Sequence, residues 1–246
     1  MKFYIDSILL WPKKTNLTYR RVKFEPDKIN IITGTSRTGK SAIITIIDYG
    51  MGNLKSVYNA LKKVNFDCQI SSEVTDIEMA DKLILPGVGA FKDAMDNLQN
   101  LDLILPIRKK VNDGCPLLGI CLGMQMLFDE GYECELRKGL GFIEGKIKLM
   151  NSKENLKIPH IGWNRIEFNR ENKILNNINK ESFVYYVHSF MATEMIDENL
   201  IAYSKYGDIN IPGIVNKGNV YGMQFHPEKS GEVGLKILKN FGVLSK

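Results

Sequence analysis

The sequence has 246 residues, of which 44% are hydrophobic and 25% are charged, with 21 glycines and 8 prolines. This balance is typical of a globular protein and excludes a collagen-like, coiled-coil or low-complexity chain. The net charge is +5, but residues 1–44 hold nine Lys/Arg and three Asp/Glu, so residues 45–246 carry 24 basic and 25 acidic side chains. The basic character belongs to the N-terminal segment alone, and we expect no nucleic-acid partner.

The sequence also lacks the marks of membrane insertion and of a cofactor site. No apolar run approaches the roughly 18 residues of a membrane span, and the start MKFYIDSILLWPKK has no small-residue cleavage site, so we expect a cytoplasmic protein without membrane contact. The cysteines are too few for a disulfide scaffold and form no C-x-x-C pair: Cys68, Cys115, Cys121 and Cys134. We expect no metal and no cofactor, and any special cysteine to act as a single nucleophile.

The N-terminal segment contains a phosphate-loop pattern. Residues 34–41 fit G-x-x-x-x-G-K-S, in which backbone N–H groups surround phosphates, Lys40 supplies positive charge and Ser41 binds magnesium. Such a loop needs a helix after Ser41, but 43–47 is a β-branched run typical of a buried strand. We therefore expect the strand to form and the nucleotide site to be incomplete; its candidate residues are Gly34, Gly39, Lys40 and Ser41.

Strands and helices alternate along the next part of the chain. The spacing of apolar residues predicts a helix over 54–64, a strand over 82–85, mainly helical structure over 90–112, a strand over 117–120 and a helix over 123–130. Short strands are predicted over 146–149, 165–168, 183–187, 201–206 and 220–224, and a closing helix over 234–244. This order predicts an α/β fold with a mostly parallel, doubly wound sheet and a strand-rich second half. We predict an extension of residues 1–44 and one domain of residues 45–246.

A nucleophile is indicated at the end of the strand predicted over 117–120. Gly119 and Gly123 flank Cys121 in the G-x-nucleophile-x-G arrangement of a strand-to-helix turn. Such an elbow projects the sulfur clear of the backbone, and the N-terminus of the following helix stabilises negative charge on it. The alternative is a buried structural cysteine, which the two flanking glycines disfavour.

A cysteine nucleophile needs a base, and the chain has three histidines: His160, His188 and His226. His226 ends a predicted strand, and Glu228 follows two residues later, where a carboxylate can hold the imidazole in the required tautomer. A histidine at a strand end is by itself more often structural. Together with the elbow, it predicts a Cys-His-Glu triad.

These motifs resemble those of the class I glutamine amidotransferases, and residues 45–246 are similar to the glutaminase subunits of imidazole glycerol phosphate synthase. The resemblance rests on GICLGMQ at 119–125, HPE at 226–228, IIDYGMGN at 46–53, LPGVGAF at 85–91, PHIGWN at 159–164 and YYVHSF at 185–190. Related glutaminases that serve anthranilate, carbamoyl phosphate or guanylate synthesis are not expected to carry the last two motifs together.

The resemblance implies that Cys121 attacks the side-chain amide of glutamine, that His226 transfers the proton to ammonia and that Glu228 orients His226. An oxyanion hole would use the N–H of Leu122 and the loop of Gly87, Val88 and Gly89, unless this loop is only a strand-ending turn. Glutamine would contact Gln125, His188, Ser189 and Phe190. For His188, a packed core histidine stays open as the alternative.

The resemblance also implies a partner, because ammonia released into water becomes ammonium and loses its nucleophilicity. The implied partner is a (β/α)₈-barrel cyclase, in a heterodimer that makes imidazole glycerol phosphate and aminoimidazole-carboxamide ribonucleotide for histidine biosynthesis. The interface is expected to include Gly52, Asn53, Lys55, Pro159, His160, Gly162, Trp163 and Asn164. A Trp163 that simply fills the core is the alternative.

Residues 1–44 depart from the family pattern and resemble the start of a P-loop ATPase that ends just after Ser41. No Ser-Gly-Gly signature follows, so we expect the ATPase machinery to be incomplete. Three alternatives stay open: the same glutaminase chemistry serving amidation of a surface-polysaccharide sugar, a P-loop module that binds nucleotide or DNA, and a catalytically inactive interaction subunit. The complete triad argues against the last of these.

Overall fold

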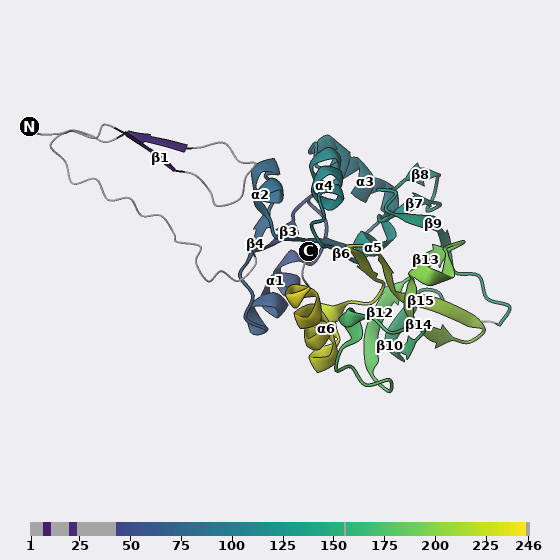
Figure 1. The fold of residues 1–246 in the computed structure, drawn as a ribbon. Coiled ribbons are helices and arrows are strands. Elements are labelled where there is room, and N and C mark those ends of the chain that lie inside the picture. Colours follow the sequence, from purple (N-terminus) through teal and green to yellow (C-terminus); the bar gives the residue numbers. More distant parts are fainter. Residues whose placement is uncertain (1–6, 11–19, 24–42, 155, 245–246) are drawn as a thin grey trace, which may run out of the picture. The chain divides into compact units, whose positions relative to one another are not determined.

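The computed structural model describes residues 7–10, 20–23, 43–154 and 156–244. The chain divides into two units, residues 1–40 and 41–246 (Figure 1). In the first unit, β1 (Ser7–Leu10) pairs antiparallel with β2 (Arg20–Lys23). The phosphate-loop residues Gly34, Gly39, Lys40 and Ser41 lie outside the described residues, so the nucleotide site stays a prediction.

The second unit is built on an eight-stranded sheet of order β11-β14-β15-β16-β6-β5-β3-β4. Neighbours from β16 to β4 run parallel, and β15, β14 and β11 continue the sheet antiparallel. The strands are β3 (Ile44–Ile47), β4 (Cys68–Ser71), β5 (Lys82–Gly87), β6 (Leu117–Cys121), β11 (Glu167–Phe168), β14 (Leu200–Tyr206), β15 (Ile209–Lys217) and β16 (Val220–Met223). The predicted α/β class with a mostly parallel sheet is confirmed, and the β-branched run at 43–47 forms β3, as expected.

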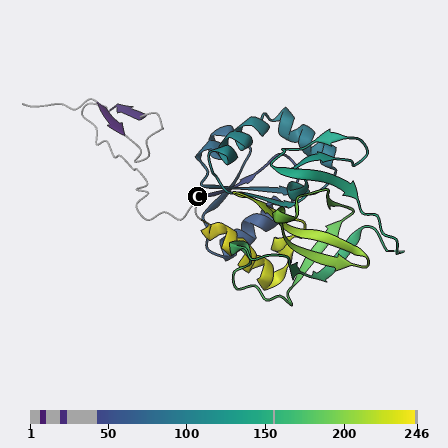
Figure 2. The same cartoon turned by 45° about the vertical axis from the view of Figure 1, so that its right-hand side comes forward.

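Helices cover both faces of this sheet because the side chains of a strand alternate between its faces. Ile44 and Ile46 pack in one core with α1 (Leu54–Lys63) and α6 (Gly231–Val243), whereas Ile47 packs in the other. The second core contains residues of α2 (Val74–Met79), α3 (Phe91–Asn100) and α4 (Ile104–Asn112). Figure 2 shows the central strands between these two helical layers. The doubly wound arrangement follows from strands that are apolar on both faces.

One element differs from the sequence prediction of a helix over 123–130. Helix α5 contains only Leu122–Gln125, and β7 begins at Phe128 and ends at Gly131. Phe128 pairs with Ile143 of β9 (Ile143–Leu149), so β7 belongs to a second sheet. Residues 122–128 are all buried, so no polar face marks where the helix stops, and pairing with β9 decides the conformation. The region 90–112 likewise forms two helices, broken at Asp102, whose φ is 55°.

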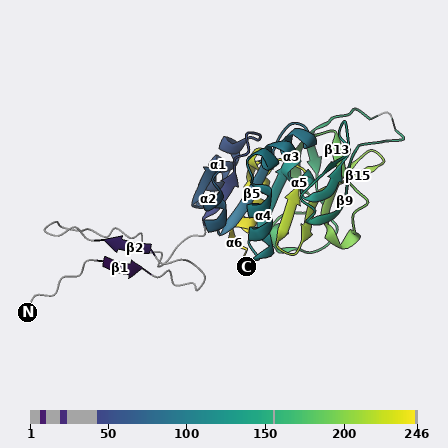
Figure 3. The ribbon, with the colours of Figure 1, turned by 90° about the horizontal axis from the view of Figure 1, so that it is seen from above.

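Two small sheets complete the unit. The first has the order β13-β9-β7-β8 and includes β8 (Arg137–Lys138) and β13 (Phe190–Thr193). The second pairs β10 (His160–Arg165) antiparallel with β12 (Phe183–His188). Short 3₁₀ helices lie at η1 (Lys173–Leu175), η2 (Asp197–Asn199) and η3 (Pro227–Lys229). From above, α1 and α2 lie at one end of the unit, and β9 and β13 lie at the other (Figure 3).

Within the described ranges, no helix is both long enough and apolar enough to cross a membrane.

Candidate active site

Cys121 stands at a sharp turn between β6 and α5. Its φ of 54° and ψ of −112° place a side-chain-bearing residue in a sparsely populated backbone region, which is characteristic of functional turns. The flanking glycines make this turn possible. A Cβ on Gly123 would collide with the carbonyl oxygen of Leu85, and a Cβ on Gly119 would come within 2.5 Å of the carbonyl oxygen of Gly123. The backbone thus has the geometry predicted for a nucleophile elbow.

His226 follows β16 and is held from several directions. Its Nδ1 lies 2.8 Å from Oε1 of Glu228, and the two side chains are 2% and 1% exposed. Its backbone N–H donates to the carbonyl oxygen of Tyr185 (2.9 Å), and the hydroxyl of Ser230 donates to its carbonyl oxygen (2.7 Å). These contacts fix both the backbone and the ring of His226.

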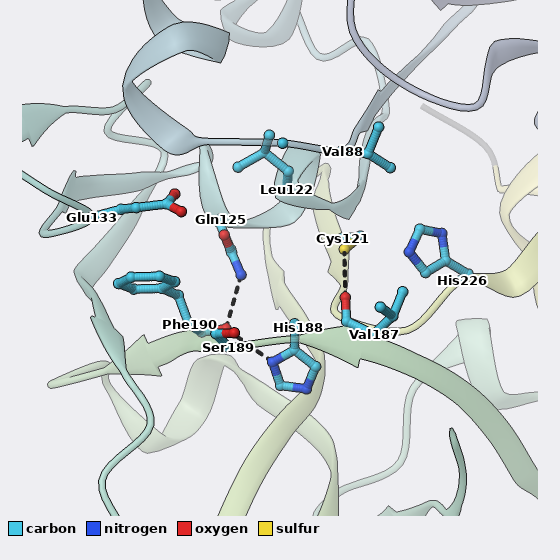
Figure 4. Close-up of a pocket in the computed structure, with 11 residues that line it drawn as sticks. Val88, Cys121, Leu122, Gln125, Glu133, Val187, His188, Ser189, Phe190 and His226 are labelled. Carbon is cyan, nitrogen blue, oxygen red and sulfur yellow. Dashed lines mark hydrogen bonds between the residues drawn. The ribbon is translucent and has the colours of Figure 1, made fainter. Parts of the chain in front are cut away.

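The imidazole of His226 lies beside the sulfur of Cys121 (Figure 4). Burial lowers the pKa of His226, but the neighbouring Cys121 sulfur and the Glu228 carboxylate outweigh burial and raise this pKa to about 9. With Nδ1 bonded to Glu228, the other ring nitrogen, Nε2, makes no hydrogen bond with any residue that the structure describes. This nitrogen is therefore free to exchange a proton with the sulfur or with a substrate.

Cys121 and His226 open into a pocket of about 280 Å³. The pocket gathers residues from the elbow, from the loop after β5, from the turn between β12 and β13, and from the segment after β7. Its lining consists of Val88, Gly89, Cys121, Leu122, Gln125, Glu133, Val187, His188, Ser189, Phe190 and His226. The structure therefore brings together most residues predicted for catalysis, for the oxyanion hole and for glutamine binding, and Glu228 lies behind His226.

Two buried glutamines connect the pocket wall to the sulfur. The side-chain amide of Gln125 donates to the carbonyl oxygen of Phe190 (2.9 Å) and to Oε1 of Gln224 (3.1 Å). The Gln224 amide in turn donates to Sγ of Cys121 (3.8 Å), and Sγ lies 3.9 Å from the carbonyl oxygen of Val187. Sequence reasoning missed Gln224 as a site residue, although it stands two positions before His226 in the motif that carries the histidine.

Glu133 is a second pocket residue that the sequence analysis did not identify. Its carboxylate accepts the backbone N–H of Phe91 (2.7 Å), and Figure 4 places it at the far side of the pocket from His226. This carboxylate supplies negative charge where a ligand's amino group can bind. No sequence signal identified Glu133, because it lies in an irregular segment between β7 and β8 without a periodic pattern.

The loop of Gly87, Val88 and Gly89 lies next to the elbow. Gly87 pairs with Cys121 at the ends of β5 and β6, and Gly89 has a φ of 109°, which favours glycine. The hydroxyl of Tyr49 donates to the carbonyl oxygen of Pro86 (2.8 Å), and burial raises the pKa of this hydroxyl. Tyr49 thus anchors the residue before the loop, while Gly89 keeps the freedom to change its backbone conformation.

The residues predicted for a partner interface divide into surface and interior positions. Trp163 is 56% exposed, so it does not fill the core, and the neighbouring Ile161 is 60% exposed. His160 is buried against Tyr186 and Tyr206 and lies behind this surface. The other predicted positions are at least partly exposed: Gly52, Asn53, Lys55, Pro159, Gly162 and Asn164.

Two solved structures share this fold. PurLQS from Thermotoga maritima aligns with a TM-score of 0.65, covering 82% of this chain and 98% of that chain at 20% identity. A structure described as a glutamine amidotransferase aligns with a TM-score of 0.64, covering 81% and 99% at 19% identity. At this identity the likeness establishes the fold.

Sequence comparison goes further. Curated relatives described as imidazole glycerol phosphate synthase subunit HisH are 50% identical in Lactococcus lactis subsp. lactis, over 80% of this chain and 96% of the relative, and 49% identical in Bacillus cereus, over 81% and 93%. The model of the family Glutamine amidotransferase class-I matches residues 45–244. The chain, with its cysteine elbow beside a histidine, therefore belongs to the class I glutamine amidotransferases.

Proposed function

We propose that this chain is the glutaminase subunit of an imidazole glycerol phosphate synthase, hydrolysing L-glutamine with Cys121, His226 and Glu228 and passing the ammonia to a cyclase subunit in histidine biosynthesis. The observation that carries the proposal is the strained elbow of Cys121, which presents its sulfur to a histidine held by a buried carboxylate. Relatives at about half identity, described as subunits of that synthase, support the choice of acceptor.

In the first half of the reaction, Sγ of Cys121 attacks the side-chain amide carbon of glutamine and forms a C–S bond. Protonated His226 gives its proton to the amide nitrogen, so the C–N bond breaks and ammonia leaves a thioester on Cys121. In the second half, His226 takes a proton from water, which attacks the thioester and releases glutamate. Glu228, bonded to Nδ1, keeps Nε2 directed at these reacting atoms.

The negative oxygen that forms in each half needs hydrogen-bond donors. The N–H of Leu122 stands directly after the nucleophile at the start of α5, and we assign it as one donor. A second donor comes from Gly87, Val88 or Gly89, and the positive φ of Gly89 supports a peptide reorientation at this point. The anchor of Tyr49 on Pro86 limits that movement to the loop itself.

The rest of glutamine fits the remaining lining of the pocket. We assign Glu133 to the α-amino group, because its carboxylate stands at the end of the pocket away from His226. Gln125 and the backbone of His188, Ser189 and Phe190 line the wall between the two ends. This placement leaves the side-chain amide of glutamine beside Cys121.

We place the cyclase, a (β/α)₈ barrel, against the exposed side of β10 and β12. Trp163 packs edge to face with Tyr185 at 5.9 Å between ring centroids, and the Lys229 ammonium lies 5.9 Å from the Tyr185 ring centroid. An exposed aromatic cluster with a cation is typical of an interface hot spot. Gly52, Asn53, Lys55, Pro159, Gly162 and Asn164 are assigned to the surrounding contact.

The test is glutaminase activity of the full chain with and without a cyclase subunit and its nucleotide substrate. We expect imidazole glycerol phosphate to form from glutamine only when both proteins are present. With free ammonium salt as the nitrogen source, the cyclase alone should form it, without glutamine and without this chain. Formation from ammonium but never from glutamine would reject the proposal. Amidation of a sugar acceptor, with no imidazole glycerol phosphate, would favour the polysaccharide alternative.

We further propose that residues 45–246 form the complete glutaminase and that residues 1–44 are dispensable. Deletion of residues 2–42 should leave the melting temperature and the glutaminase activity unchanged, because β3 begins at Ile44 and retains its pairing with β4 and β5. Activity that changes with added nucleotide in the full chain, but not in the truncated one, would contradict this and favour a functional P-loop.

A further inference from the structure

A row of buried and partly buried polar side chains runs from the pocket wall to strand β10. Nδ1 of His188 lies 2.9 Å from the carbonyl oxygen of Phe190, and its Nε2 lies 3.3 Å from Nδ1 of His160. Nε2 of His160 then lies 3.4 Å from the side-chain nitrogen of Asn164. The two histidines stand directly opposite each other in the β10–β12 pair. The proposed triad chemistry leaves these contacts without a role.

Each hydrogen bond in this row has a determined direction. The carbonyl oxygen of Phe190 can only accept, so Nδ1 of His188 donates. Burial lowers the pKa of His160 and of His188 to about 4, and neutral rings carry one proton each. Nε2 of His188 is therefore an acceptor, and Nδ1 of His160 must donate to it.

The far end of the row is fixed by the backbone. The side-chain oxygen of Asn164 accepts the N–H of Arg165 (2.8 Å), and its nitrogen donates to the carbonyl oxygen of Lys205 (2.8 Å). The amide nitrogen therefore faces His160, whose Nε2 accepts. Donation runs in one direction, from Asn164 through His160 and His188 to Phe190.

The row ends on an atom that belongs to the pocket. The carbonyl oxygen of Phe190 also accepts the amide of Gln125, which bonds Gln224 and through it the sulfur of Cys121. A displacement of His188 would move this carbonyl and with it the side chain of Gln125. At the other end, β10 carries the exposed Ile161 and Trp163.

We propose that His160 and Asn164 are positioning residues for the glutamine pocket, which hold His188 as a neutral acceptor and thereby couple the position of β10 to the Phe190 carbonyl. The part that concerns glutamine rests on the proposed glutaminase function. If the two histidines only filled the core, His160 would not have to carry its proton on Nδ1.

The first experiment reads the tautomers directly and does not depend on activity. In ¹⁵N-labelled full-length protein, NMR of the histidine side chains should show both His160 and His188 neutral at about pH 6, each with its proton on Nδ1, whereas free histidine prefers Nε2–H. In Asn164→Ala, the proton should stay on Nδ1 of His160, which still bonds Nε2 of His188, but the ¹⁵N signal of its Nε2 should shift because this nitrogen loses its donor. A proton on Nε2 of either ring in the wild type, or a charged ring at this pH, would overturn the inference.

The second experiment compares two substitutions of His160. Asn can place an amide donor near the position of Nδ1, whereas Leu removes the donor and leaves Nε2 of His188 unpaired. With glutamine as substrate, KM should rise about 10-fold in His160→Leu, as expected for one lost buried hydrogen bond, and about 3-fold or less in His160→Asn. Equal KM values in both variants, high or low, would overturn the inference.

Misfolding of a variant and failure of the proposed function must be told apart from failure of this inference. If His160→Leu does not fold, Asn164→Ala takes its place, because Asn164 is only partly buried, and a KM equal to that of the wild type would then overturn the inference. If the wild type hydrolyses no glutamine, with or without a cyclase, the proposed function fails. The tautomers of His160 and His188 still decide whether the row exists.

Discussion

The two sides of the active site are built in different ways. The nucleophile side, residues 117–125, is a strand, a cysteine and a helix in immediate succession, with β5 and β16 on either side of the strand. The histidine side, residues 220–230 together with β12, is held by contacts between residues far apart in the chain. His226 N–H donates to Tyr185 O, and Tyr185 N–H donates to the hydroxyl of Ser230 (3.0 Å).

This difference determines where the site tolerates substitution. The elbow stores backbone strain at Cys121 and allows no Cβ at Gly123, so a small change there has no neighbouring contact to compensate it. The orientation of His226 is shared among Glu228, Tyr185 and Ser230. We therefore expect all-or-none effects on the nucleophile side and graded effects on the histidine side.

The largest effect is expected for Cys121→Ala. Without the sulfur no thioester can form, and glutamine hydrolysis should fall by a factor of about 10⁴ or more. The matched control is Cys134→Ala, because Cys134 is exposed and does not line the pocket. Steady-state release of glutamate measures both variants. Wild-type activity in Cys121→Ala would show that Cys121 is not the nucleophile.

On the histidine side, the losses should be graded. His226→Ala removes the proton carrier and should approach the effect of Cys121→Ala, whereas Glu228→Gln keeps the ring and should cost about 100-fold less. The ratio of the two kcat values, measured with saturating glutamine, tests this. If Glu228→Gln were as severe as His226→Ala, the orientation of the ring would depend on this one contact, and the comparison would be wrong.

Gly123→Ala tests the rigidity of the elbow through stability. The added Cβ on helix α5 would collide with the carbonyl oxygen of Leu85 in the buried strand β5. We expect a loss of about 3 kcal/mol in the free energy of unfolding. Gly114→Ala is the control, because Gly114 has a φ of 85° but a Cβ there would meet nothing within 4 Å, so only backbone strain of about 1 kcal/mol applies. Urea denaturation gives both values. Equal losses would show that the elbow is no more crowded than a surface turn.

The smallest effect is expected in the pH dependence of kcat/KM, which is set by His226 beside Cys121. His226 has a pKa of about 9, so it stays protonated at neutral pH and can supply the proton to ammonia. Above pH 9 we expect kcat/KM for glutamine to fall about tenfold per pH unit. Folding raises this pKa above its ordinary value of 6.5, so the protonated ring also stabilises the fold below pH 6.5, and this contribution is lost as the pH rises through 9.

The pH profile has its own control. Glu228→Gln removes one of the two groups that raise the pKa of His226, so the fall in kcat/KM should begin at lower pH. The melting temperature of both proteins, measured across the same range, separates unfolding from loss of the proton donor. A midpoint that does not move in Glu228→Gln would mean that this carboxylate does not set the protonation of His226.

Local patterns in the sequence determined much of this protein. The glycines around Cys121, the apolar runs of β3, β5 and β6 and the helical spacing of α1 could be predicted because each depends on residues close together in the chain. The triad could be predicted because its motifs resemble those of a known family. The end of α5 could not, since residues 122–128 are buried on every side.

Contacts between side chains far apart in the sequence depend on the tertiary structure. Gln224 reaches the sulfur, Glu133 enters the pocket and His160 turns inward to His188 because sheets and loops from separate parts of the chain converge there. A sequence pattern records the period of one element, but not the element that it packs against. Hydrogen bonds between residues tens of positions apart therefore become visible only when the chain is folded.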